Sequence, residues 1–320
     1  QLEAALAATA EFDAAAELDI TLADSTGSSD SVTVNVDNRG GADTDAVIDM
    51  SGVETLNLAV LDLDTGNNAQ VVLTNADVAT VNVTAGFAGA VLAMGTLDTL
   101  TTTVDTTAYN GDVTFTGANT DGITFNSAAA TANSAVTLGD GADTATVAST
   151  GAVDVDIDGG AGTDVLNLTV TTGFVDAGEI DGFETINLTI AAGVDITLGA
   201  TTSETNGIDE AAALNVTGGN SLSTFTVGVI GTELMNTTTL LSVDASAFTG
   251  NTKLFYDTDA LLATMALKAG ALTTDTIEVI IDAAGSDLTY NTNGFETFTA
   301  TMSTAGRTHT MSLEKMVGLT

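Results

Sequence analysis

Short segments in which apolar and polar residues alternate occur along most of the chain. Clear examples are Val32–Val36, Val81–Thr84, Val113–Thr116, Val153–Asp158, Leu166–Val170 and Leu214–Thr217. A period of two places every second side chain on one face of a strand. The polar positions of these segments are mostly Thr, Asn and Asp. The pattern therefore predicts many short strands with one apolar and one polar face.

Two segments carry a helical pattern instead. Residues 1–19 are rich in Ala and Glu, which are good helix formers, and Leu2–Leu18 is predicted to be a short N-terminal helix or a linker. Asp259–Lys268 places Leu261, Leu262, Met265 and Ala266 on one helical face. This second segment is predicted to be a packed surface helix or a cap.

Two phrases recur at long intervals. The first is Gly-(Val/Phe)-Glu-Thr, which begins at Gly52, Gly182 and Gly294. The second is shared by Val104–Gly111 and Val243–Gly250, which correspond position for position. Such repetition is typical of a chain made of related modules. We expect a lead-in over residues 1–19, one β-repeat module over 20–158, a second over 159–281, and the start of a third module or a cap over 282–320.

Many short strands without long helical spacers indicate an all-β fold. We predict an irregular right-handed parallel β-solenoid, with tandem β-sandwich domains as the alternative. Aromatic residues are only 4% of the chain and Trp is absent, which suits the thin core of a solenoid. There is no Pro, which is consistent with long, continuous strand pairing because Pro removes a ladder donor.

The charge of the chain limits its partners. It carries 43 acidic and 5 basic residues, for a formal net charge of −38. No Lys or Arg lies between Arg39 and Lys253, so the basic footprint required for nucleic-acid binding is missing. An anionic membrane surface would repel the chain, and no apolar run is long enough to insert in a membrane. Self-repulsion at this charge requires screening by cations or salt.

One segment has the pattern of a metal-binding turn. Gly159–Asn167 fits the calcium-binding nonapeptide G-G-x-G-x-D-x-U-x, and Leu138–Thr146 fits it except for the first glycine and a weak Ala145. Glycines let backbone carbonyls point at an ion, and Asp supplies the carboxylate that Ca²⁺ prefers. The candidate Ca²⁺ ligands are Gly139, Asp140, Gly141, Asp143, Asp158, Gly160, Gly162 and Asp164. Tight acidic turns without a metal are the alternative.

Other acidic residues are weaker candidates for the same chemistry. Asp43 and Asp45 form one possible site, and Asp282 and Asp287 form another that lacks the glycines. The two nonapeptide-like turns are 21 residues apart, which is not a multiple of nine, so isolated ions are expected in place of a continuous stack.

The glutamates of the first phrase, Glu54, Glu184 and Glu296, could be metal ligands or could cap turns by accepting backbone N–H bonds. Capping is the more common role for a carboxylate at such a position.

The sequence gives no indication of catalysis. It has no Ser/His/Asp set, no phosphate-binding loop and no H-E-x-x-H motif, and its one histidine is His309. Solenoid enzymes that act on acidic polysaccharides need basic residues to hold the substrate, and residues 40–252 contain none. We therefore expect a non-enzymatic protein, and a polysaccharide-acting solenoid enzyme is the least favoured alternative.

The nonapeptide-like turns and the two repeated phrases resemble the Thr/Asp/Gly-rich surface-layer and large surface proteins of Gram-negative bacteria that carry calcium-binding RTX repeats. The resemblance covers most of residues 30–300. It implies type I secretion, calcium-triggered folding outside the cell and assembly into a lattice. The chain departs from the pattern because it has no dense tandem run of nonapeptides and no recognisable secretion tail.

The function expected from this resemblance is an extracellular structural protein at the cell surface. Such a protein would be a calcium-stabilised subunit of a surface layer or filament that assembles with copies of itself, with cell-surface polysaccharide as a possible further partner. The alternative is a stalk segment of a large adhesin.

Overall fold

The structure is a computed structural model of the 320-residue chain. It describes residues 5–11, 16–22, 27–38, 44–63, 69–74, 77–84, 91–109, 111–130, 134–149, 156–172, 174–175, 179–198, 207–208, 213–227, 242–257, 266–281, 288–289, 291–302 and 311–312. The chain divides into two compact units. Unit 1 comprises Gln1–Ala148 and Val155–Asp164, and unit 2 comprises Ser149–Asp154 and Val165–Thr320.

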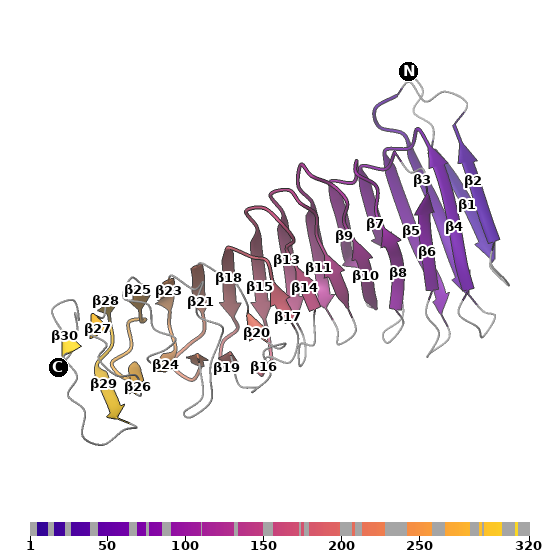
Figure 1. The fold of residues 1–320 in the computed structure, drawn as a ribbon. Coiled ribbons are helices and arrows are strands. Elements are labelled where there is room, and N and C mark those ends of the chain that lie inside the picture. The colour runs from indigo at the N-terminus through magenta and orange to yellow at the C-terminus, as the bar shows by residue number, and fades with distance from the viewer. Residues whose placement is uncertain are drawn as a thin grey trace. The chain divides into compact units, whose positions relative to one another are not determined.

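Unit 1 contains two parallel sheets whose strands alternate along the chain (Figure 1). The first sheet contains, in order, β1 (Ala5–Glu11), β3 (Ser31–Asn38), β5 (Thr55–Leu63), β7 (Thr80–Thr84), β9 (Thr103–Ala108), β11 (Thr124–Ala130) and β13 (Thr144–Ser149). The second contains β2 (Ala16–Thr21), β4 (Thr44–Ser51), β6 (Ala69–Thr74), β8 (Val91–Thr96), β10 (Asp112–Thr116), β12 (Ala135–Thr137) and β14 (Asp156–Asp158). One full turn of the solenoid is a coil of the chain. Each coil therefore contributes one strand to each of the two sheets.

Unit 2 is built in the same way (Figure 1). Its first sheet contains β15 (Val165–Val170), β18 (Thr185–Ile190), β21 (Ala213–Gly218), β23 (Ser242–Phe248), β25 (Ala266–Lys268) and β28 (Asn291–Asn293). Its second contains β16 (Phe174–Val175), β19 (Asp195–Leu198), β22 (Thr224–Val227), β24 (Asn251–Asp257), β26 (Thr276–Ile281) and β29 (Thr297–Met302). Two short parallel pairs complete it: β17 (Glu179–Asp181) with β20 (Gly207–Ile208), and β27 (Leu288–Thr289) with β30 (Met311–Ser312).

The predicted all-β parallel solenoid is confirmed. Strand pairs in both units are parallel, as in β3–β5 and β18–β21, whereas a β-sandwich would be built from antiparallel hairpins. Alternation decides which side chains enter the core. In β18, Ile186, Leu188 and Ile190 are buried, while Thr189 between them is exposed. The core of each unit is thus a stack of Val, Leu and Ile side chains, one layer from each coil.

The outward positions of the first sheets form asparagine ladders. In unit 2, Asn187 Nδ2 donates to Asn167 Oδ1 at 2.9 Å, and Asn215 Nδ2 donates to Asn187 Oδ1 at 2.9 Å. In unit 1, Asn82 Nδ2 donates to Asn57 Oδ1 at 3.0 Å. Each amide therefore joins its coil to the neighbouring coil at the same register position.

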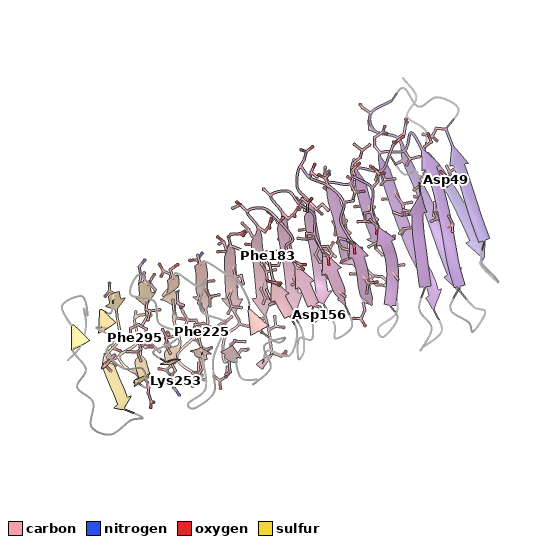
Figure 2. All side chains as sticks on the ribbon, viewed as in Figure 1. Asp49, Asp156, Phe183, Phe225, Lys253 and Phe295 are labelled. Atoms are coloured by element: carbon pink, nitrogen blue, oxygen red, sulfur yellow. The ribbon has the colours of Figure 1, made fainter. Side chains whose placement is uncertain are left out.

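The Gly-(Val/Phe)-Glu-Thr phrase forms a corner that leads into a strand. Its glycines have left-handed φ angles of 74° at Gly52, 69° at Gly182 and 84° at Gly294, a conformation that favours glycine. The next residue turns inward, and Val53, Phe183 and Phe295 are all buried; Figure 2 labels the two phenylalanines. The Thr that ends the phrase begins β5, β18 or β29. This repeated phrase thus encodes a strand entry.

The second phrase forms a β-bulge. The pairing of β7 with β9 shifts after Asp105, so that Thr84 lies opposite Ala108, and the pairing of β21 with β23 shifts after Asp244 in the same way. The Asp105 carboxylate accepts a bond from the Thr107 N–H at 2.9 Å, which stabilises the extra residue. The aromatic residue at the end of each phrase, Tyr109 or Phe248, is buried.

The two predicted helices require correction. The short N-terminal helix over Leu2–Leu18 is wrong, because these residues include β1 and the start of β2. Parallel pairing of β1 with β3 and of β2 with β4 prevails over the helix propensity of Ala and Glu. The helix over Asp259–Lys268 is also wrong at its C-terminal end, where Ala266–Lys268 is strand β25 with Leu267 buried. Residues 259–265 lie outside the described residues.

The predicted module boundaries, residues 1–19, 20–158, 159–281 and 282–320, stay predictions.

Among the described residues, no helix has the length and apolar character needed to cross a membrane.

Candidate metal-binding turns

The two nonapeptide-like segments are stacked turns of unit 1. Residues 138–143 lie on residues 117–123, and residues 159–164 lie on residues 138–143. The Asp140 N–H donates to Asn119 O at 3.1 Å, and the Ala161 N–H donates to Gly139 O at 3.2 Å. The spacing of 21 residues between the turns is therefore the length of one coil.

The glycines of these turns are required by the close approach of one backbone to the next. A Cβ atom on Gly139 would lie 2.1 Å from Asn119 O, and one on Gly160 would lie 2.0 Å from Gly139 O. The corresponding distances are 2.2 Å from Gly141 to Gly122 N and 1.9 Å from Gly162 to Gly141 O. Since real Cβ contacts are longer than these distances, only glycine fits. Stacking alone thus accounts for the four glycines of the motif.

Two of the candidate ligands, Asp143 and Asp164, are buried and accept backbone hydrogen bonds. Asp143 Oδ2 accepts from the Gly139 N–H at 3.0 Å, and its Oδ1 accepts from the Ile123 N–H on the preceding coil. Asp164 Oδ1 accepts from the Asp143 N–H at 2.7 Å. Each carboxylate therefore caps an N–H group of the coil before it, at the entry to a strand of the first sheet.

The environment of Asp143 disfavours its charge. Burial raises the pKa of the Asp143 carboxyl, and this effect outweighs the lowering by the N–H groups of Ile123 and Gly139. The nearby Asp140 carboxylate raises the pKa of Asp143 further. A cation close to Asp143 would oppose both unfavourable effects.

The other two candidate carboxylates are more accessible. Asp140 is exposed, and Asp158, at the end of β14, is half-buried. Asp158 Oδ1 accepts from the Gly160 N–H at 2.8 Å, which closes the turn. These are the carboxylates of the motif that an ion arriving from solvent would meet first.

The fit of calcium to these turns is partial. Ca²⁺ takes six to eight oxygen ligands, whereas both oxygens of Asp143 already accept N–H bonds. Within the ranges that the structure describes, no group of three or more His, Cys, Asp or Glu side chains is placed to hold a metal ion. Calcium binding by these turns stays a prediction.

Of the weaker candidates, the structure describes only Asp45. Asp45 lies in β4, opposite Gln70 of β6. Asp43, Asp282 and Asp287 lie outside the described residues.

The glutamates of the corner phrase are caps at two of the three positions. Glu54 Oε2 accepts from the Asp30 N–H at 2.7 Å, and Glu296 Oε2 accepts from the Asp275 N–H at 3.0 Å. A second hydrogen bond joins the same two residues in the opposite direction. The Glu N–H donates to the carbonyl of the same Asp, at 3.1 Å for Glu54 and 3.2 Å for Glu296. The capping role is thus observed for Glu54 and Glu296.

The partners of these glutamates, Asp30 and Asp275, were missed by sequence reasoning. Both are buried, with 3% and 0% of their surface exposed. The available signal was an acidic residue one coil before the glutamate, 24 residues before Glu54 and 21 residues before Glu296. Because coil length varies, this spacing is not recognisable before the register is known.

The pKa of the buried Asp275 carboxyl is strongly raised. Burial and, secondarily, the charge of Glu296 raise its pKa from 3.8 to about 6, although a hydrogen bond from the Thr252 N–H opposes the shift. That bond is 2.6 Å long and ends on Asp275 Oδ1.

No family model, curated protein or solved structure matches this chain.

Proposed function

We propose that this chain is a structural segment of an extracellular protein, a subunit of a surface layer or filament that assembles with copies of itself at the cell surface. The observation that carries the proposal is the use made of the repeated motifs. Corner phrases, bulge phrases and glycine turns each make contacts with a neighbouring coil. A sequence whose distinctive residues serve stacking is suited to a mechanical role, because the product of stacking is a stiff, regular body.

The charge of the chain supports a dependence of assembly on cations. With a net charge of −38, two copies repel each other unless counterions are held between them. The outward rows of Asn and Thr supply neutral hydrogen-bonding groups for a contact between copies once that repulsion is screened. Cell-surface polysaccharide, which can be neutral, is a further partner that this surface suits.

Calcium enters the proposal at the accessible carboxylates of the stacked turns. Asp140 and Asp158 would bind the ion, while Gly139, Gly141, Gly160 and Gly162 hold the turns close together and Asp143 and Asp164 keep their capping bonds. This arrangement uses carboxylates that solvent reaches and leaves the buried network unchanged.

The test is static light scattering with negative-stain electron microscopy on EDTA-treated protein at constant ionic strength. Titration with Ca²⁺ should produce growth in mass and a regular lattice or filament, and Mg²⁺ at the same concentration should act more weakly. Asp140→Asn should shift the transition to higher Ca²⁺, whereas Asp98→Asn, at an exposed turn elsewhere in unit 1, should not. A protein that stays monomeric at every Ca²⁺ concentration would refute the proposal and support an adhesin stalk.

A further inference from the structure

A second acidic location, in unit 2 and away from the glycine turns, has the features of a cation site. It lies where β24, β26 and β29 pair as parallel neighbours. The register places Lys253 opposite Thr276, so the residues just before them, Thr252 and Asp275, are also neighbours on adjacent coils. The Thr252 N–H donates to Asp275 Oδ1 at 2.6 Å, which confirms their proximity.

Both side chains are turned into the core. Thr252 and Asp275 are each 0% exposed. Burial alternates along β24, so that Thr252 and Leu254 are buried while Lys253 between them, labelled in Figure 2, is exposed. The ammonium group of Lys253 is therefore on the opposite side of the strand and does not neutralise Asp275.

Two buried oxygen atoms at this place have no hydrogen bond. They are Asp275 Oδ2 and Thr252 Oγ1. Buried polar atoms are satisfied in the great majority of cases, and a buried carboxylate oxygen without a partner is especially unfavourable. The two atoms belong to register neighbours, and a ligand that binds both would satisfy them.

Glu296 supplies a second carboxylate on the following coil. Its Oε2 accepts the Asp275 N–H at 3.0 Å, so the two acidic side chains are held close together. The charge of Glu296 raises the pKa of Asp275, after the larger effect of burial. Glu296 is only half-buried, so one carboxylate of this acidic pair is in contact with solvent.

We propose that Asp275, Thr252 and Glu296 bind one divalent cation of the Ca²⁺ type. Two carboxylates balance a double positive charge, whereas Na⁺ would leave one negative charge in the core. The site has fewer than three acidic side chains, so main-chain carbonyls and water must complete the shell, which Ca²⁺ tolerates more readily than Mg²⁺ because its geometry is flexible. The proposal does not depend on the function proposed above.

The test counts bound ions in the full chain by equilibrium dialysis against Ca²⁺ in about 0.15 M NaCl, where diffuse surface binding is screened. Asp275→Asn keeps the shape of the side chain and should bind one ion fewer than the wild type. Thr252→Val should weaken the same ion about tenfold through loss of a single oxygen ligand. Asp98→Asn makes the same Asp-to-Asn change at an exposed turn of unit 1 and is the control, with an unchanged ion count.

Thermal unfolding gives an independent readout. Ca²⁺ should raise the Tm of the wild type by more than that of Asp275→Asn, while the two proteins should respond alike to Mg²⁺. Asp140→Asn should retain the ion at Asp275, which separates this site from the glycine turns. An Asp275→Asn protein that binds as many ions as the wild type would overturn the proposal, and would assign the unbonded oxygens to a protonated Asp275.

Discussion

At the scale of single residues, glycines in this chain serve two purposes that the sequence does not distinguish. Gly160 and Gly95 both have left-handed backbones, with φ of 84° and 68°. A Cβ on Gly160 would lie 2.0 Å from Gly139 O, whereas a Cβ on Gly95 would meet no atom within 4 Å. Gly160 therefore permits both the left-handed backbone and the close approach of two coils, whereas Gly95 permits only the left-handed backbone.

This difference predicts unequal effects of alanine. Gly95→Ala should cost about 1 kcal/mol, which is the strain of a left-handed alanine. Gly160→Ala should cost about 3 kcal/mol or more, because the coils must also separate. Urea unfolding of the two variants at equal ionic strength measures the difference, and equal losses would contradict the steric account.

Asp275 predicts an unusual pH dependence of stability in the absence of divalent ions. Its pKa is about 6 in the folded chain and 3.8 in the reference state, so the folded chain binds the proton more tightly. Well below pH 4 the protonated carboxyl does not lower the free energy of unfolding. As the pH rises between the two pKa values the ionised carboxyl lowers it progressively, and above pH 6 the full loss of stability is present.

Asp275→Asn should therefore be more stable than the wild type in EDTA at about pH 7.5, by up to about 3 kcal/mol. The asparagine Oδ1 can still accept the Thr252 N–H. The advantage should shrink as the pH falls toward about 5, which is still above the pI of about 4.1. Urea midpoints across this range measure it, and an advantage that does not change with pH would indicate a packing effect instead.

At the scale of elements, the strands and the capping role of the corner glutamates were predictable, whereas the residues that they cap were not. Alternation along Leu166–Val170 and Leu214–Thr217 predicts β15 and β21, because a half-buried strand needs that period. The alanines of Leu2–Leu18 favour a helix or a linker locally, and the pairing of β1 with β3 overrides that preference. The capping of Asp30 by Glu54 depends on which coil lies beside which, and local sequence does not contain that information.

The asparagine ladder of unit 2 gives a prediction at this scale. Asn187 both donates to Asn167 and accepts from Asn215. Asn187→Ala should cost about 1–2 kcal/mol, since it removes two hydrogen bonds and leaves both neighbours half-satisfied. Thr169→Val, at an exposed outward position of β15, should change stability by no more than about 0.5 kcal/mol. Chemical denaturation with a β-structure signal compares the two.

At the scale of the whole molecule, the repeating unit is one coil. In unit 1 the Thr124 N–H donates to Thr102 O at 2.8 Å, and the Thr144 N–H donates to Ile123 O at 2.9 Å. Thr124 and Thr144 therefore occupy the same position on successive coils. Residues 124–143 are one complete coil, which includes β11, β12 and the turn 138–143.

Deletion of residues 124–143 should leave a folded protein, because Ile123 would then precede Thr144 and the strand entry is preserved. Unfolding should remain cooperative, with a urea m-value reduced in proportion to the surface lost. Deletion of residues 124–133 is the control. It removes β11 but retains β12, so the alternation between sheets fails and the β signal and cooperativity should be lost. Equal tolerance of both deletions would contradict a coil-by-coil architecture.

The corner phrase also affects how such a chain changes over generations. The phrase requires three features: a glycine in the left-handed conformation, such as Gly52, a side chain that points into the core, such as Val53, and a carboxylate that accepts a bond from the preceding coil, such as Glu54. Substitutions at outward positions leave these contacts intact, and whole coils can be duplicated or lost without disturbing the remainder. Descendants of one ancestral coil can therefore retain a common fold after their sequences have diverged beyond the reach of alignment.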